Sequence, residues 1–261
     1  MAQVKKRSTL KVWGDVIFAI LLREIKSKFN DKFGIAWSVV SPLAFIFMLA
    51  FIRGLMDGGE THGIPTFFFM VYGLLYVQLF LGVVGAVSSA IKKNKPLYAF
   101  RQVQPISSVI AISGFEVLSK LFVMLIIGII SYYLHYEPFI FDPIMLISNF
   151  IQVGLLGTCV GLLFALASSF IPEVDKLRTL IMRPIFFISG IFFSLQDIPR
   201  ELWPYLTWNP LLHAVELTRF AAYPHYGDLG VSSFYLNICT FLALFFALAC
   251  YHISWKQAIS R

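Results

Sequence analysis

The chain has 261 residues, of which 58% are hydrophobic, 16% aromatic and only 13% charged, with a mean hydropathy of +0.78. This apolar fraction exceeds that of an ordinary water-soluble domain and excludes water as the main solvent of the fold. The formal net charge of +7 would also suit a nucleic-acid-binding protein, but the distribution of the basic residues explains it differently, as described below. The cysteines Cys159, Cys239 and Cys250 lie inside apolar runs without CxxC or Cys/His spacing, so neither a disulfide framework nor a zinc site is indicated.

Residues 1–33 predict a cytoplasmic leader that carries an interfacial helix. The apolar run at residues 16–22 is far shorter than the roughly 20 residues that cross a bilayer, and charged residues flank it on both sides. No small-residue cleavage site follows this run, so we expect the leader to be retained rather than removed as a signal peptide.

Residues 34–261 predict one transmembrane domain, because apolar runs near the length of a bilayer span recur along them. Backbone groups have no water to bond in hydrocarbon, so each run is expected to be helical. The predicted fold class is therefore an all-α integral membrane protein with six transmembrane helices. These spans are expected at residues 34–55, 65–90, 110–134, 143–170, 177–196 and 232–255.

The distribution of Lys and Arg predicts that both termini face the cytoplasm. Six spans place the leader, two internal loops and the tail on one side, and these segments hold 17 of the 21 Lys and Arg residues. The opposite side holds only Arg53, Arg200 and Arg219. Because positively charged loops stay in the cytoplasm, this asymmetry sets the orientation and accounts for the basic balance without nucleic acid.

The last external loop, residues 196–230, is too long for a plain turn and carries four prolines among aromatic residues. We expect two periplasmic re-entrant half-helices, at residues 200–207 and 211–220, with Asn209-Pro210 breaking the chain between them. Such backbone is tolerated at membrane depth where protein or a wet cavity surrounds it, so the loop is a candidate wall of a transport path. An interfacial cap is an equally good interpretation of the pattern.

A set of short motifs in residues 182–219 resembles the signature of the type-2 ABC exporter permeases. In order, these motifs are Ile188-Ser189-Gly190-Ile191, Ile198-Pro199, Asn209-Pro210-Leu211-Leu212-His213 and Arg219. Further motifs are similar to those of capsular polysaccharide export permeases of the Kps, Bex and Ctr kind, and the resemblance covers nearly the whole chain. They are Arg23-Glu24-Ile25-Lys26, Lys95-Pro96-Leu97, Gln104-Pro105-Ile106 and Phe170-Ile171-Pro172-Glu173.

The resemblance implies a homodimer of this subunit in a bacterial inner membrane, bound to two ATP-binding cassette subunits and moving a lipid-linked polysaccharide outward. Periplasmic and outer-membrane export proteins are implied as further partners. The chain has no Walker A glycine-lysine pattern, so no cofactor is expected in it, and ATP and Mg²⁺ are expected on the partner ATPase. By this interpretation the chain is a transport subunit and not an enzyme.

In the resembling family, short cytoplasmic segments transmit motion of the ATPase to the spans. The residues on the matching segments of this chain are Arg23, Glu24, Lys92, Lys95, Arg101, Glu173 and Asp175. For the individual lysines, the alternative is that they only obey the positive-inside rule.

Aromatic residues suggest a path for sugar. Phe69, Tyr72, Tyr76 and Phe80 recur at helical spacing, so their rings lie on one face of the second predicted span. Aromatic faces stack on the C–H faces of pyranose rings, and tyrosine hydroxyls bond the edges of these rings. The full predicted path adds Phe186, Phe193, Trp203 and Trp208. Ordinary packing or lipid contact is the alternative for each ring.

Two charged pairs have simpler interpretations than function. Glu116 and Lys120, at i,i+4 spacing in the third predicted span, are expected to form a structural ion pair. His213 and Glu216 have i,i+3 spacing but supply too few ligands to predict a metal site.

Other function classes fit the sequence less well. A secondary transporter would be expected to show an internal repeat, and a membrane-embedded enzyme would need clustered His, Asp or Glu within the spans. Neither pattern occurs in the sequence. Permeases for O-antigen, teichoic acid, drugs or haem share the expected architecture and remain alternatives within the exporter class.

Overall fold

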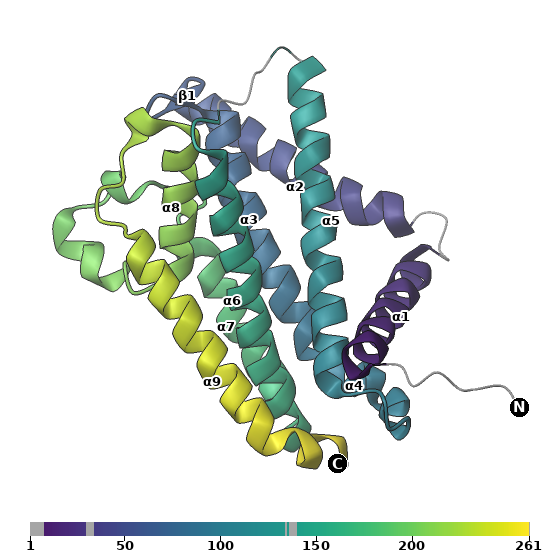
Figure 1. Cartoon of the computed structure of the whole chain (residues 1–261). Coiled ribbons are helices and arrows are strands. Elements are labelled where there is room, and N and C mark those ends of the chain that lie inside the picture. The colour runs from purple at the N-terminus through teal and green to yellow at the C-terminus, as the bar shows by residue number, and fades with distance from the viewer. Residues whose placement is uncertain (1–7, 30–33, 134, 136–139, 261) are drawn as a thin grey trace, which may run out of the picture.

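The computed structural model describes residues 8–29, 34–133, 135 and 140–260, and these form an all-α bundle with one short β-hairpin (Figure 1). The basic residues at positions 5–7, 32 and 261, which contribute to the predicted orientation, lie outside these ranges. The helices are α1 (Thr9–Phe29), α2 (Gly34–Asp57), α3 (Thr66–Ser88), α4 (Ala90–Asn94), α5 (Pro105–Tyr133), α6 (Pro143–Phe170), α7 (Val174–Ile188), α8 (Pro210–Ala222) and α9 (Ser233–Ser260).

Short elements connect these helices. The hairpin joins α2 to α3 through β1 (Glu60–Thr61) and β2 (Ile64–Pro65), which pair antiparallel with Thr61 opposite Ile64. The 3-10 helices are η1 (Lys95–Ala99), η2 (Leu195–Asp197), η3 (Arg200–Tyr205) and η4 (Pro224–Tyr226). The prolines of the external loop explain η3 and the break before α8, because Pro210 takes the first position of α8, where its missing N–H costs nothing.

Within the described residues, four helices are long and apolar enough to cross a membrane: α3, α5, α6 and α9. They confirm the helices predicted at residues 65–90, 110–134, 143–170 and 232–255. The apolar part of α2, Val40–Met56, is shorter, and α7 has 15 residues. The full count of six spans therefore stays a prediction, while the all-α membrane class is confirmed.

The fifth predicted span ends earlier than its hydropathy indicates. Residues 177–196 are mostly apolar and are interrupted by Arg178 and Arg183, but α7 already stops at Ile188. Gly190 has a φ of 74°, a left-handed conformation that a continuing α-helix of L-residues does not use. Residues 191–193 are therefore apolar but not helical, and their carbonyl groups need partners from elsewhere in the fold.

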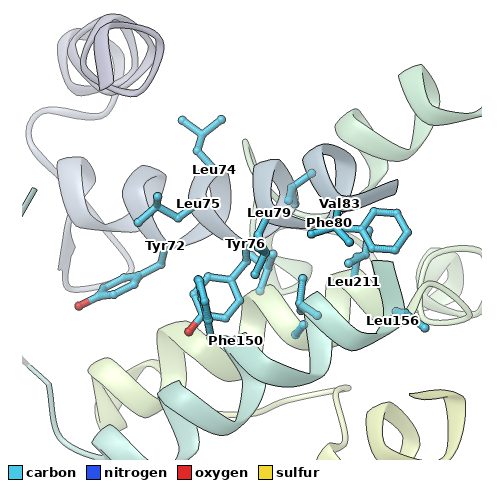
Figure 2. Packing of buried hydrophobic residues seen from close by; sticks show 14 of the residues in the cluster. Tyr72, Leu74, Leu75, Tyr76, Leu79, Phe80, Val83, Phe150, Leu156 and Leu211 are labelled. Atoms are coloured by element: carbon cyan, nitrogen blue, oxygen red, sulfur yellow. The ribbon is translucent and has the colours of Figure 1, made fainter. Parts of the chain in front are cut away.

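Helix α3 forms the centre of the core and packs against α2, α5, α6 and α8. Its residues are apolar on every side, as expected of a helix that is buried all round. Figure 2 shows the side chains of α3 meeting Phe150 and Leu156 of α6 and Leu211 of α8.

The two ends of the bundle differ in structure. The hairpin lies at one end, and α4, the adjacent end of α5 and the C-terminus lie at the other, where α1 packs against α5 (Figure 1). We refer to these as the hairpin end and the α4 end.

Candidate functional site

The motif residues that lie far apart in the sequence meet at the break between α7 and α8. Asn209 caps α8, since its side-chain oxygen accepts the N–H of Leu211 at 3.0 Å. The amide nitrogen of the same side chain donates to the Ser189 hydroxyl at 3.0 Å. Asn209 therefore holds the start of α8 against the end of α7, which explains why an asparagine precedes Pro210 in the motif.

Gly190 makes this close approach possible. A Cβ atom at this position would lie 2.6 Å from a methyl carbon of Leu212 on α8, in addition to the strain of a positive φ. The Ser189 hydroxyl donates back to the Ile185 carbonyl at 2.5 Å and so closes the last turn of α7. The Ser189-Gly190 pair is thus the structural stop of α7.

Arg219 of α8 is the largest fully buried side chain, with 0% of its surface exposed. Its guanidinium N–H groups donate to the main-chain carbonyls of Phe69, Ile191 and Phe193 at 3.1–3.3 Å and to Glu216 at 3.1 Å. All five N–H donors of the guanidinium have an acceptor in these contacts. Gly73 of α3 leaves the space for this, because a Cβ there would lie 2.9 Å from a guanidinium nitrogen. Arg219 therefore satisfies the carbonyls that the early end of α7 leaves free, and ties them to α3.

Glu216 supplies the countercharge. It is 2% exposed and accepts from the Tyr226 hydroxyl at 2.8 Å as well as from Arg219. The Ser194 hydroxyl and the Leu195 N–H lie 3.5 and 3.4 Å from its carboxylate oxygens. A buried carboxylate needs both a paired charge and hydrogen bonds, and Glu216 has both.

His213 links the external loop to α9. Its Nε2–H donates to the Thr207 carbonyl at 2.7 Å, and its Nδ1 accepts the Ser232 N–H at 3.0 Å. A carbonyl only accepts and an amide N–H only donates, so these partners select the neutral ring with the proton on Nε2. Burial lowers the pKa of His213 below its ordinary value, which agrees with the neutral form. His213 therefore ties the loop to α9, whereas Glu216 bonds to Arg219 and Tyr226.

Two histidines fasten the hairpin over the network of Arg219 and Glu216. Nε2 of His62 lies 2.6 Å from Oδ1 of Asp197, and Nε2–H of His225 donates to the Gly63 carbonyl at 2.9 Å. Asp197 also accepts the Ser194 N–H at 2.9 Å and so completes a capping box on η2. The hairpin, η2 and η4 therefore close the hairpin end of the break.

The aromatic residues predicted to guide sugar lie inside the subunit. Phe69, Tyr72, Tyr76 and Phe80 are each at most 4% exposed. The Tyr76 hydroxyl donates to the Leu146 carbonyl at 2.8 Å, and its ring meets Phe150 edge-on at 5.7 Å (Figure 2). Their burial favours the packing alternative, and sugar would reach these rings only if α3 separated from its neighbours. Their role in a path stays a prediction.

The other predicted path residues are more accessible. Phe186 belongs to an aromatic cluster with Phe187 and Phe192, and Phe193 lies beside the break, where its carbonyl accepts from Arg219. Trp208 is exposed in the loop before α8, while Trp203 is half-buried and donates to the Ile198 carbonyl at 2.9 Å. Pro199, also a motif residue, directly precedes η3.

The residues predicted to couple to an ATPase gather at the α4 end. Lys92, Lys95 and Arg101 are exposed on α4, η1 and the turn that follows. Arg23 of α1 bonds to Glu24 at 2.9 Å and also to the buried Asn94, the last residue of α4. The leader helix and the first internal loop are thus directly connected.

The second internal loop carries the remaining coupling residues. Glu173 is exposed in the turn between α6 and α7, and Asp175 lies 3.9 Å from Arg178 in the first turn of α7. Within α5, Lys120 donates to the Gln78 side chain of α3 at 3.2 Å. A Cβ at Gly82 would lie 3.4 Å from Glu116, so this acid also faces α3. Both members of the predicted pair are therefore oriented toward α3.

The sequence interpretation missed the partners of Arg219. Glu216 was considered only as a metal ligand, although its i,i+3 spacing to Arg219 within an apolar helix is a recognisable sign of a buried ion pair. Ser194, Tyr226 and Asn94 carried no local signal, because their roles depend on contacts across 22, 10 and 71 positions in the sequence.

Comparison with known proteins gives consistent similarities. The family model described as ABC-2 type transporter matches residues 15–223. The polysialic acid transport protein KpsM of Escherichia coli is 32% identical over 246 residues, which cover 94% of this chain and 95% of that protein. The capsule polysaccharide export inner-membrane protein CtrC of Neisseria meningitidis serogroup B is 20% identical, over 92% of this chain and 91% of that protein. The capsule polysaccharide export inner-membrane protein BexB of Haemophilus influenzae is 21% identical, over 88% of this chain and 86% of that protein.

Proposed function

The chain belongs to the ABC-2 type transporter family, and we propose that it is the transmembrane subunit of an ATP-driven exporter that moves lipid-linked capsular polysaccharide across a bacterial inner membrane. The observation that carries this proposal is the match to a polysialic acid transport protein along almost the full length of both chains. The matches to two capsule polysaccharide export proteins support it.

The proposed complex contains two copies of this subunit and two separate ATP-binding subunits, which bind ATP and Mg²⁺. The exposed basic residues Lys92, Lys95 and Arg101 support a docking surface at the α4 end. Periplasmic and outer-membrane export proteins would receive the polymer. In this proposal the subunit crosses the membrane six times, α2 and α7 complete the set of spans, and both termini face the cytoplasm.

Force would reach the hairpin end through α7. Its first turn follows Glu173 at the α4 end, and the residues directly after its last turn are joined to α8 by Asn209 and to α3 through Arg219. Because these contacts are buried and fully paired, the break, α8 and the adjacent part of α3 move as one body. We propose that this body, with α8 as a re-entrant element, forms part of the wall of the polysaccharide path.

The proposal is tested with the purified complex. We would co-express the chain with a candidate ATP-binding cassette subunit and measure ATP hydrolysis in proteoliposomes with candidate substrates. Stimulation by a capsular glycolipid, and not by O-antigen or teichoic acid precursors, drugs or haem, is the expected result. Charge reversal at both Lys95 and Arg101 should abolish this stimulation while this chain remains membrane-inserted. If only a drug or haem stimulated ATP hydrolysis, the transported substrate would belong to that class and the polysaccharide proposal would be wrong.

The orientation is tested separately. A cysteine introduced beside Asp228 should react with a membrane-impermeant thiol reagent from the periplasm, and one beside Lys95 should react only after the membrane is opened. The reverse pattern would refute the proposed topology.

A further inference from the structure

A cavity of about 380 Å³ lies between α2, α3 and α5 at the hairpin end. It is separate from the network of Arg219 and Glu216. Phe51 and Leu55 line it and are also exposed, so it opens to the surface of the subunit. The lining residues are Phe47, Ala50, Phe51, Gly54, Leu55, Gly59, Pro65, Thr66, Phe67 and Ser131.

The walls of this cavity are suited to hydrocarbon. Phe47 and Phe67 face each other across α2 and α3 with ring centroids 5.2 Å apart. A Cβ at Gly54 would meet no atom within 4 Å, so the space beside this residue is open. An apolar hollow in a membrane-facing surface is filled by the surrounding solvent, and in a bilayer that solvent is an acyl chain.

One polar group interrupts the apolar wall. Ser131 of α5 is 1% exposed, and its hydroxyl has no hydrogen-bond partner among the described residues. Several other helical serines in this chain, such as Ser108, Ser169 and Ser254, donate to a carbonyl of their own helix. A buried hydroxyl that makes no such bond retains a donor for a ligand.

The depth of Ser131 indicates which acceptor it would meet. Tyr132 and Tyr133 follow it at the end of α5 and are 70% and 76% exposed. Exposed tyrosines at the end of an apolar helix mark the boundary between hydrocarbon and headgroups. Ser131 therefore lies at the level where ester linkages join acyl chains to glycerol.

We propose that this cavity binds one acyl chain of a membrane phospholipid, with the Ser131 hydroxyl donating to the ester carbonyl of that chain. The chain lies along the wall that Phe47 and Phe67 form together and fills the space beside Gly54. The bound lipid packs α2 against α3 and α5 on the side opposite the break.

The test uses the full-length protein, purified from a host without capsule genes and placed in nanodiscs. The probe is a diester phosphatidylethanolamine with a photoreactive diazirine in one acyl chain, and mass spectrometry locates the labelled residues. We expect labelling of Phe51, Phe67 or Leu55. Gly54→Trp fills the cavity and should reduce labelling of Phe67 at least fivefold, whereas Met48→Trp, on the exposed face of α2 outside the lining, should leave it unchanged.

A competition measurement requires no cavity-filling variant. Unlabelled diester lipid should displace the probe about fivefold better than the diether analogue, which has no ester carbonyl, because one neutral hydrogen bond is lost. In Ser131→Ala the two competitors should be equal.

Three outcomes would overturn the proposal. Labelling could be spread evenly over the exposed helix faces and be unaffected by Gly54→Trp, or it could require added capsular glycolipid. Alternatively, a cysteine at Phe51 could form a disulfide with the same position of a second copy, which would make this face a dimer interface.

Discussion

The guanidinium carbon of Arg219 lies 3.4 Å from the centroid of the Phe69 ring, and the same guanidinium donates to the main-chain carbonyl of Phe69. One residue of α3 thus contacts the buried cation with both its ring and its backbone. The ring also shields this guanidinium from water, which strengthens the ion pair of Arg219 with Glu216.

Removal of this cation should be severe. Arg219→Met leaves Glu216 without its countercharge and removes the donor from the non-helical carbonyls of Ile191 and Phe193, so we expect a loss of about 3–5 kcal/mol of stability. The measurement is the thermal unfolding of detergent-purified protein. The double variant Arg219→Met with Glu216→Gln should recover part of the loss, because no buried charge is left unpaired. Wild-type stability of the single variant would contradict the role given to Arg219.

The stop at Gly190 can be separated into its two physical causes. Gly190 and Gly227 have similar φ angles of 74° and 78°, but only Gly190 has a side chain within contact of an added Cβ. Gly227→Ala should cost the backbone strain alone, roughly 1 kcal/mol or more, and Gly190→Ala should cost clearly more because of Leu212. Equal losses in the two variants, measured by the same unfolding assay, would mean that the close approach of α8 has no energetic consequence.

His213 should make the fold sensitive to acid. Its pKa is lower in the folded state than in the unfolded chain, so the unfolded chain binds the proton more readily. This contribution to stability is fully present above the unfolded pKa, near 6.5, and is lost as the pH falls through the folded pKa. We expect the unfolding temperature to drop between pH 7.5 and 5, and to drop less in His213→Gln. If the unfolding temperature fell equally with pH in the wild type and in His213→Gln, His213 would not be the cause of the acid sensitivity.

Much of the helical framework is readable from hydropathy. The span predicted at residues 143–170 has the bounds of α6, and those at 65–90 and 232–255 differ from α3 and α9 by a few residues. The agreement has a physical basis, because in hydrocarbon a long apolar run has little alternative to a helix. At α5, the polar first turn after Pro105 lowers the local hydropathy, so the prediction began five residues too late.

The break could not be predicted in the same way. Residues 191–193 are Ile, Phe and Phe, and their hydropathy is the same whether the backbone is helical or not. Their conformation depends on Arg219, which lies 26 or more positions away and supplies the donors they lack. The motif indicated which residues matter, but the contacts among them arise only when α3, α7 and α8 are assembled.

The leader should act through Asn94. Arg23 donates to this buried side chain, which in turn donates to the Ala90 carbonyl and so fixes the end of α4. Arg23→Ala and Asn94→Ala should each weaken the coupling of ATP hydrolysis to transport, and the double variant should be little worse than either one. The interaction energy of this double-mutant cycle should be on the order of 1 kcal/mol, since Arg23 is partly solvated. If the losses of coupling in the two single variants added up in the double variant, Arg23 and Asn94 would act independently.

The buried tyrosines of α3 allow the packing and transport interpretations to be compared directly. Tyr76→Phe removes only the hydrogen bond to the Leu146 carbonyl and should cost about 1 kcal/mol of stability. Tyr76→Ala also creates a cavity beside Phe150 and should cost about 3–5 kcal/mol. Both losses are measured as unfolding temperature and as the amount of folded protein in the membrane.

Export then has to be compared per folded molecule. Because Tyr76 is fully buried against α6, we expect polysaccharide export to fall in step with folded protein for both variants, and export per molecule to stay within about twofold of wild type. Tyr72→Ala provides the matched test one turn away on α3. If export per folded molecule instead fell about tenfold in the double variant Tyr72→Ala with Tyr76→Ala, but less in the double phenylalanine variant, loss of stacking on the order of 1 kcal/mol per ring would be the cause. That result would mean that α3 separates from α6 during transport and exposes these rings to the sugar.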